Sequence, residues 1–255
     1  MELRQQQNMR MLRETEQGLR EEKSYASGPK GFATDVARWN KALKIISILK
    51  ECRGEQGRPS LLDIGTGNGE IAGCLGQLYD VVSVDVKDQR TVSDGFTFIQ
   101  LDGEALPFSD RSFDIVVSNH VIEHVADAIR HLSEIERVLK DDGLAYLATP
   151  NRLWPWEVHN RLPLLHYFPT VIFNAVLKLL GRYQEDISPL TWWTLSRMLK
   201  KAFLVSVVSD RICKRPLKYH MQCNPLTAKI LSWIPLWFYR KCTFIHPTLV
   251  VVLRK

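Results

Sequence analysis

Two common structural supports are missing from this 255-residue sequence: paired cysteines and long apolar segments. The five cysteines are odd in number and include no Cys-x-x-Cys pair, so they support neither a disulfide framework nor a zinc site. No apolar run reaches the roughly 18 to 20 residues that a membrane-spanning helix requires. The nearest candidates, residues 171–180 and 231–239, are interrupted by Asn174, Lys178 and Pro235. The N-terminal residues also lack the apolar stretch of a secretory signal, so we expect a reducing, cytoplasmic setting.

Acidic residues are scarce in the second part of the chain. Residues 1–150 carry a net charge of −6, whereas residues 151–255 contain 16 Lys or Arg and only 4 Asp or Glu, a net charge of +12. A basic region of this kind suits nucleic acid, an anionic membrane surface or a phosphorylated substrate, and also an ordinary solvated surface. The same region is rich in tryptophan, which favours a lipid headgroup interface or a packed core.

Glycine is concentrated at one point. Residues 61–70 read Leu-Leu-Asp-Ile-Gly-Thr-Gly-Asn-Gly-Glu, an apolar strand end that runs into three alternating glycines. Glycines let the backbone turn sharply and approach a ligand without a Cβ atom, and a helix starting near Asn68 would direct unpaired N–H groups at that ligand. We therefore predict a nucleotide-cofactor loop, with a simple tight turn as the alternative. Its candidate binding residues are Asp63, Gly65, Thr66, Gly67 and Gly69.

An acidic residue follows at the interval that a βαβ unit requires. Residues 80–85 form a short β-branched run that ends at Asp85, which lies 20 positions after Gly65. A carboxylate at this place can accept hydrogen bonds from both ribose hydroxyls of a nucleotide. Asp85 and its neighbour Val86 are therefore candidate cofactor-binding residues, and a solvated loop aspartate is the alternative for Asp85.

Further elements follow in the same order. A third strand is expected at residues 96–100, and a fourth at residues 112–119. Between them, residues 102–108 read Asp-Gly-Glu-Ala-Leu-Pro-Phe, a turn bounded by glycine and proline. A helix with one apolar stripe is expected at residues 128–140, with a stop at residues 141–143 and a fifth strand at residues 144–148.

Residues 60–151 together resemble the class I S-adenosylmethionine-dependent methyltransferases. The acidic strand end followed by Gly-x-Gly-x-Gly is similar to motif I of that family, whereas the dinucleotide fingerprint requires a third glycine where this chain has Glu70. Asp-x-Glu-x-Leu-Pro-Phe and Phe-Asp-x-Val, at residues 102–108 and 113–116, resemble the branch that includes quinone-biosynthesis (methyltransferase type 11) enzymes.

The resemblance implies a fold and a cofactor. The fold is α/β, a Rossmann-like seven-stranded and mostly parallel sheet with helices on both faces, an N-terminal helical cover and an insertion after strand five. The cofactor is S-adenosylmethionine, with S-adenosylhomocysteine as its product. Asp102 is expected to cap the adenine amino group and the backbone at Gly103 to read the ring edge. Asn119, at the end of strand four, completes the candidate cofactor-binding set.

We expect a single domain over residues 1–255, in keeping with its length and 45% hydrophobic content. Its predicted parts are an N-terminal helical cover (1–58), a cofactor-binding half (59–150), an acceptor-roof insertion (151–187) and a C-terminal half (188–255). Further elements are expected within these parts: helices at 2–23 and 37–50 joined by a link at 24–31, a helix at 191–201, strand six at 203–209 and an antiparallel last strand at 248–253.

The mechanism implied by this cofactor limits what the protein must supply. A sulfonium methyl is already activated, so the acceptor atom must be held in line about 3 Å away while water is excluded. An oxygen acceptor also loses a proton, for which His120, His124 and His159 are candidate bases, with Glu123 and His166 nearby in the sequence. Each histidine could equally be a helix cap or a pocket wall. Glu123 with His124 is an incomplete ligand set, so no metal is assigned.

The sequence thus predicts methyl transfer to a small-molecule, lipid-linked or glycan-linked acceptor, at oxygen. The alternatives are C-methylation of a quinone-like ring, a nicotinamide-dependent oxidoreductase, and a catalytically silent cofactor-binding subunit. Nucleic acid is disfavoured because residues 118–121, Ser-Asn-His-Val, differ from the Asn/Asp-Pro-Pro-Tyr/Phe of enzymes that methylate amino groups of bases. The insertion resembles that of bacterial methyltransferases associated with cell-surface glycans and lipid-linked intermediates. Peripheral contact with the inner membrane surface through the basic half is a further expectation.

Overall fold

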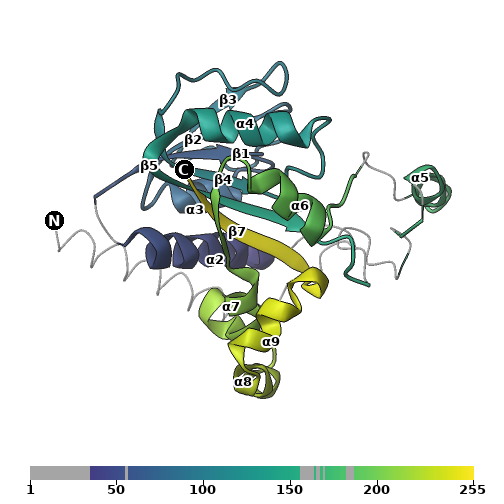
Figure 1. The fold of residues 1–255 in the computed structure, drawn as a ribbon. Coiled ribbons are helices and arrows are strands. Elements are labelled where there is room, and N and C mark those ends of the chain that lie inside the picture. Colours follow the sequence, from purple (N-terminus) through teal and green to yellow (C-terminus); the bar gives the residue numbers. More distant parts are fainter. Residues whose placement is uncertain (1–34, 55–56, 156–163, 165–166, 169, 182–186) are drawn as a thin grey trace.

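The computed structural model describes residues 35–255 except 55–56, 156–163, 165–166, 169 and 182–186. Its centre is a seven-stranded sheet in the order β3-β2-β1-β4-β5-β7-β6 (Figure 1). Only β7 runs antiparallel, pairing with β5 on one side and β6 on the other. The predicted fold class and the antiparallel last strand are therefore confirmed. The strands are β1 (Ser60–Ile64), β2 (Asp80–Asp85), β3 (Thr97–Gln100), β4 (Phe113–Asn119), β5 (Leu139–Pro150), β6 (Leu204–Val207) and β7 (Thr248–Arg254).

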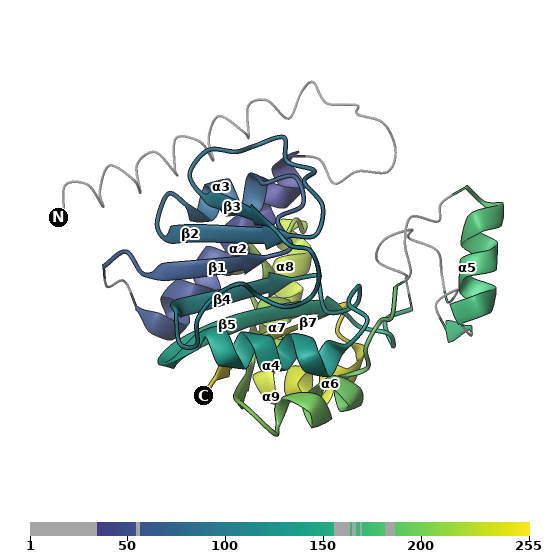
Figure 2. The ribbon, with the colours of Figure 1, turned by 90° about the horizontal axis from the view of Figure 1, so that it is seen from above.

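Helices cover both faces of the sheet, as Figure 2 shows from above. One apolar cluster joins α2 (Asp35–Arg53), α3 (Glu70–Leu75) and α7 (Ser209–Lys214) to one face, and a second joins α4 (Ala128–Val138) and α6 (Trp192–Leu199) to the other. The central strands are buried on both faces, which explains why their sequences are continuous apolar runs rather than alternating ones. The other helices are α5 (Thr170–Leu179), η3 (Pro216–Tyr219), α8 (Pro225–Trp233), α9 (Leu236–Lys241) and η4 (Thr243–Ile245).

The end of α4 differs from the prediction. The helix stops at Val138 instead of residue 140, and Leu139 is already extended and paired with Phe113 of β4. Gly143 therefore does not end a helix. A Cβ atom there would lie 2.8 Å from the Leu139 side chain and 3.0 Å from the Asp114 carbonyl oxygen, so glycine is required by the close approach of β4 and β5.

Smaller boundary differences have local causes. α3 begins at Glu70 rather than near Asn68, because Gly69 has a left-handed φ of 86° and serves as the N-cap. β6 ends at Val207, and Ser209 already begins α7. α2 extends beyond the predicted residues 37–50 at both ends. The predicted helix at 2–23 and the link at 24–31 lie outside the described residues.

The insertion after β5 carries α5, which stands apart from the sheet in both views (Figures 1 and 2). No helix among the described residues is both long enough and apolar enough to cross a membrane.

Candidate functional site

The glycine loop lies between β1 and α3, at the carboxyl end of β1. Gly65, Gly67 and Gly69 all have left-handed φ values, of 87°, 54° and 86°. A Cβ atom on Gly69 would lie 2.1 Å from the Val92 carbonyl oxygen, so the chain after β2 crosses the loop at contact distance. The backbone N–H groups of Thr91 and Val92 both donate to the Asn68 carbonyl oxygen at 3.0 Å. This second segment holds the glycine loop in a fixed conformation.

Asp85 lies beside this loop, at the carboxyl end of the neighbouring strand β2. Its Oδ2 atom accepts a hydrogen bond of 2.9 Å from the Gly67 N–H, and its Oδ1 atom accepts one of 3.2 Å from the Lys87 N–H. The structure thus brings together the acid and the glycines that the 20-residue spacing had suggested. Val86, the next residue, is exposed.

Asp63 has a different environment from Asp85. It is buried under the loop, where Ser83 Oγ donates to its Oδ2 atom at 2.7 Å and lies 2.6 Å from Thr66 Oγ1. Burial raises the pKa of Asp63 to about 7, against the opposing effect of the Ser83 hydrogen bond. Asp63 and Thr66 are therefore placed to support the loop from beneath.

The segment after β3 carries Asp102 and Gly103, both of which are exposed. The Leu101 N–H donates to the Asp85 carbonyl oxygen at 2.8 Å, which ties the start of this segment to the end of β2. Its far end is held by Arg137 of α4, whose guanidinium donates to the carbonyl oxygens of Leu106 at 3.0 Å and Phe108 at 2.6 Å.

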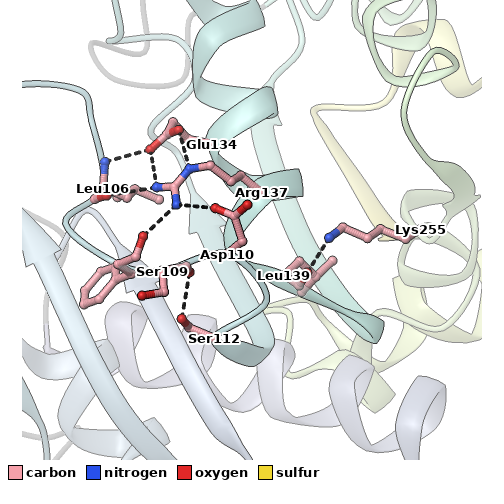
Figure 3. A network of polar contacts seen from close by, with 9 residues as sticks. Leu106, Ser109, Asp110, Ser112, Glu134, Arg137, Leu139 and Lys255 are labelled. Carbon is pink, nitrogen blue, oxygen red and sulfur yellow. Dashed lines mark hydrogen bonds and ion pairs between the residues drawn. The ribbon is translucent and has the colours of Figure 1, made fainter.

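Figure 3 shows that Arg137 is itself held by two carboxylates. Its guanidinium lies 3.0 Å from Asp110 Oδ1 and 2.8 Å from Glu134 Oε1, and Glu134 also accepts from the Leu106 N–H at 2.9 Å. The Leu-Pro-Phe turn that the sequence suggested is thus a fixed support for Asp102, and Arg137 is a residue that sequence reasoning missed.

Asn119 ends β4 on the other side of the loop. Its Oδ1 atom is buried and has no hydrogen-bond partner among the described residues. An orphaned buried acceptor is costly unless a ligand donates to it. The carboxylates of Asp85 and Asp102, the unpaired amide oxygen of Asn119 and the glycine loop thus fit a ligand with several donor groups, such as a nucleoside.

The residues after β4 form a compact acid–base cluster. His120 has a left-handed φ of 62°, and its Nδ1 atom lies 3.3 Å from Glu123 Oε1. His124 Nε2 lies 4.0 Å from the same oxygen, and Thr149 Oγ1 of β5 donates to Glu123 Oε2 at 2.9 Å. Two of the three predicted catalytic histidines therefore meet at one buried carboxylate. The third, His159, lies outside the described residues, as does His166.

The protonation states of this cluster suit proton transfer. Burial lowers the pKa of His120, against the opposing attraction of Glu123. Burial, the largest single effect, raises the pKa of Glu123, but the contact with His120, a backbone hydrogen bond and the charge of His124 together lower the net pKa. A neutral imidazole that donates from Nδ1 to an ionised carboxylate keeps Nε2 as a proton acceptor.

Two lysines of α2 approach the same cluster, and sequence reasoning missed them. Burial, with a smaller contribution from the charge of Lys41, lowers the pKa of Lys44 to about 8. Burial also lowers the pKa of Lys41, with the charge of Arg38 adding to the effect and that of Glu123 opposing it. No sequence pattern marks these lysines, because residues 37–50 read simply as a covering helix. Their charges would stabilise an anionic group beside His120.

A cavity of about 230 Å³ lies between the segment after β5 and the residues that lead into α6. It adjoins the acid–base cluster, since the Ser188 N–H in its wall donates to the Glu123 carbonyl oxygen at 2.8 Å. The wall is mostly apolar with one cationic side chain, that of Arg152. The lining residues are Arg152, Phe168, Phe173, Ile187, Ser188, Pro189, Leu190, Thr191 and Thr194. Within the described part of the chain, no three His, Cys, Asp or Glu side chains gather as a metal site would require.

Comparison with known proteins agrees with this geometry. Residues 62–147 match the family model described as a methyltransferase domain. The chain is 30% identical over 144 residues to the demethylmenaquinone methyltransferase of Chlorobaculum tepidum, covering 54% of this chain and 57% of that one. It is 28% identical over 150 residues to the ubiquinone/menaquinone biosynthesis C-methyltransferase UbiE of Desulfotalea psychrophila, covering 50% and 61%. The chain thus spans little more than half the length of these curated relatives.

The fold has a solved counterpart in a crystal structure of an S-adenosylmethionine-dependent methyltransferase from Mesorhizobium loti. The TM-score is 0.55 at 17% identity, and the match covers 83% of this chain and 98% of that one. Residues 62–147 thus form a methyltransferase domain, and the fold is that of the class I S-adenosylmethionine-dependent methyltransferases. The curated proteins that this region is similar to include quinone-biosynthesis methyltransferases.

Proposed function

We propose that this protein transfers a methyl group from S-adenosylmethionine to an oxygen atom of a small-molecule, lipid-linked or glycan-linked acceptor. One observation carries the proposal: the glycine loop and Asp85 meet at the carboxyl edge of the sheet, where open α/β proteins bind ligands. The buried Oδ1 atom of Asn119 has no hydrogen-bond partner among the described residues, and a donor group of a ligand would satisfy it.

Each group of candidate residues would contact a different part of the cofactor. Asp85 would accept from the ribose hydroxyls, Asp102 and Gly103 would meet the adenine, and the loop glycines with Asn119 would surround the rest. Asp63 and Thr66 would act indirectly, by holding the glycine loop in the conformation that binds the cofactor. When bound, the cofactor supplies a methyl group on a positively charged sulfur.

His120 and Glu123 would take up the proton that an acceptor hydroxyl loses. With the cofactor bound, the acceptor oxygen would take the methyl group, and the carbon–sulfur bonding pair would stay on sulfur. The hydroxyl proton would pass to His120, whose positive charge the buried Glu123 would balance. Lys41 and Lys44 would stabilise negative charge on the acceptor oxygen before transfer.

The cavity lined by Arg152, Phe173 and Ser188 is the proposed acceptor pocket. Its apolar wall suits a ring or an acyl chain, and Arg152 suits an anionic substituent such as a phosphate. We propose that residues 151–187 roof this pocket, that the whole chain is one methyltransferase domain, and that it acts in the cytoplasm.

Transfer to carbon is the second candidate, because the relatives include an enzyme named as a C-methyltransferase. The same cluster would serve it, since a ring carbon becomes nucleophilic when an adjacent hydroxyl loses its proton. The third candidate, a catalytically silent subunit, would bind S-adenosylhomocysteine without transferring a methyl group.

The test uses methyl-labelled S-adenosylmethionine, the purified chain and extract of its source organism. Label in the organic phase would support a lipid-linked acceptor, and label in the aqueous phase a sugar or other soluble one. Carbon-13 chemical shifts of the labelled product then separate an O-methyl ether from a C-methyl group. Binding of S-adenosylhomocysteine without any labelled product would contradict the proposal and favour the silent subunit.

A further inference from the structure

The helices α8 and α9 expose an apolar face that the proposed reaction does not use. Leu226, Ile230 and Trp233 of α8 follow each other at four and three residues, so they share one stripe of the helix. This stripe faces solvent, with exposures of 67%, 55% and 76%. Trp237 and Phe238 of α9 continue it, at 59% and 45%. These five residues are called the α8–α9 face below.

In an ordinary surface helix the large apolar side chains face the core, whereas in α8 and α9 they face solvent. The single buried side chain of α8 is the small Ala228, and that of α9 is Tyr239. A helix whose large apolar residues face water loses the stabilisation that burial would give, so it needs another partner to cover them.

The α8–α9 face is nevertheless held in a fixed position. Lys214 of α7 donates to the carbonyl oxygens of Ser232 at 3.1 Å and Ile234 at 2.7 Å, at the end of α8. The Tyr239 hydroxyl donates to the Leu231 carbonyl oxygen at 2.8 Å, and Arg240 pairs with Asp210 at 3.1 Å. Figure 1 shows α7, α8 and α9 together, projecting to one side of the sheet.

Positive charge dominates around the α8–α9 face, and the one acidic side chain described above, Asp210, is buried and paired with Arg240. Residues 211–255 contain nine Lys or Arg and no Asp or Glu. Lys229 and Arg240 are exposed on the two helices, and Lys241 Nζ lies 5.4 Å from the centre of the Trp237 ring. Exposed tryptophans and aliphatic side chains beside lysines are the composition of helices that lie in the headgroup region of a membrane.

We propose that the α8–α9 face docks on the surface of a bilayer that contains anionic phospholipid. Charge argues against a second copy of the chain, because a symmetric contact through this face would place lysines against lysines. The aliphatic Leu226 and Ile230 argue against nucleic acid, because aliphatic side chains have no flat face on which a base can stack. A bilayer interface accommodates both kinds of apolar side chain and attracts the positive charges.

The experiment is co-sedimentation of the full-length chain with vesicles of phosphatidylcholine alone and of phosphatidylcholine with phosphatidylglycerol. The native chain should bind the anionic vesicles, and the double variant W233A/W237A should bind them roughly 10- to 100-fold more weakly. K229Q and K241Q should each weaken binding about fivefold, and added salt should do the same. Ile129→Ser, on α4 at the opposite side of the molecule in Figure 1, is the matched control and should bind like the native chain.

Circular dichroism and S-adenosylhomocysteine binding verify that each variant is folded. The proposal is overturned if the native chain does not sediment with anionic vesicles, if W233A/W237A sediments as well as the native chain, or if phosphatidylcholine alone binds equally. A native chain that dimerises through these tryptophans without binding vesicles would assign the face to a second copy. Retention of single-stranded DNA through the same tryptophans, without vesicle binding, would assign it to nucleic acid.

Discussion

The Asp85 carboxylate accepts a hydrogen bond of 2.9 Å from the backbone N–H of Gly67, which joins the end of β2 to the glycine loop after β1. These two residues lie 18 positions apart in the sequence; Asp85 ends β2, and Gly67 lies in the loop that follows the neighbouring parallel strand β1. Their contact fixes the distance between the loop and the acid before any ligand binds, which is the arrangement that a nucleoside-binding site requires.

Removing the Asp85 carboxylate should weaken cofactor binding. Asp85→Ala is expected to cost about 1.5 to 3 kcal/mol, the usual range for hydrogen bonds to a charged group, or roughly 10- to 150-fold in affinity for S-adenosylhomocysteine. Isothermal calorimetry gives the value. The control is Asp88→Ala, three residues after Asp85. It removes an exposed carboxylate that pairs with Arg90, and it should leave the affinity for S-adenosylhomocysteine unchanged. Equal affinities for all three proteins would disprove the ribose assignment.

Gly69 should tolerate no side chain. In Gly69→Ala the new Cβ atom would meet the Val92 carbonyl oxygen at 2.1 Å, on a backbone with φ of 86°. Gly54→Ala is the matched control, because its φ is 83° and nothing lies within 4 Å. Both variants carry the left-handed strain of about 1–2 kcal/mol, and Gly69→Ala should lose about 1–3 kcal/mol more through the collision. Urea denaturation measures both, and equal losses would mean that the segment at Val92 moves aside freely.

The Glu123 carboxylate should affect the rate of methyl transfer rather than the affinity for the cofactor. Glu123→Gln keeps the shape of the side chain but cannot balance a protonated His120, so the rate of methyl transfer should fall about 10²- to 10⁴-fold. The affinity for S-adenosylhomocysteine should stay unchanged. Glu136→Gln, on α4, is the control that should leave both unchanged. A native rate in Glu123→Gln would show that the acceptor is already ionised when it binds.

Asp63 should make folding stability depend on pH. Its pKa is raised from 3.8 to about 7 in the folded protein, so the folded state keeps a proton that the unfolded state releases. The contribution is fully present below pH 3.8 and is lost as pH rises through about 7, a change of about 4 kcal/mol. Asp63→Asn cannot ionise, so the difference in unfolding free energy between it and the native chain should shift by that amount between pH 4 and pH 8. Parallel pH profiles would contradict the assignment.

The parts of the fold and site that the sequence predicts are those encoded locally. The turn at Gly65, the spacing to Asp85 and the apolar central strands each lie within a short segment, and the structure has them as expected. The resemblance to a known family adds the antiparallel β7, which no local pattern specifies.

The missed features depend on contacts between distant segments. Lys41 and Lys44 reach the cluster at Glu123 only because α2 packs across the sheet, and Arg137 reaches the turn at Leu106 from a different helix. The same holds for Trp233, since a tryptophan in an interrupted apolar run reads equally well as core or as surface. Whether Trp233 is buried or exposed depends on how distant segments pack, which the sequence of one segment does not specify.

The most direct test of the central claim is a calorimetric titration of the full-length chain with S-adenosylhomocysteine and, in parallel, with NAD⁺. The site at Gly67, Asp85 and Asn119 predicts saturable binding of S-adenosylhomocysteine and none of NAD⁺. Binding of NAD⁺ without binding of S-adenosylhomocysteine would contradict the account and make the chain an oxidoreductase.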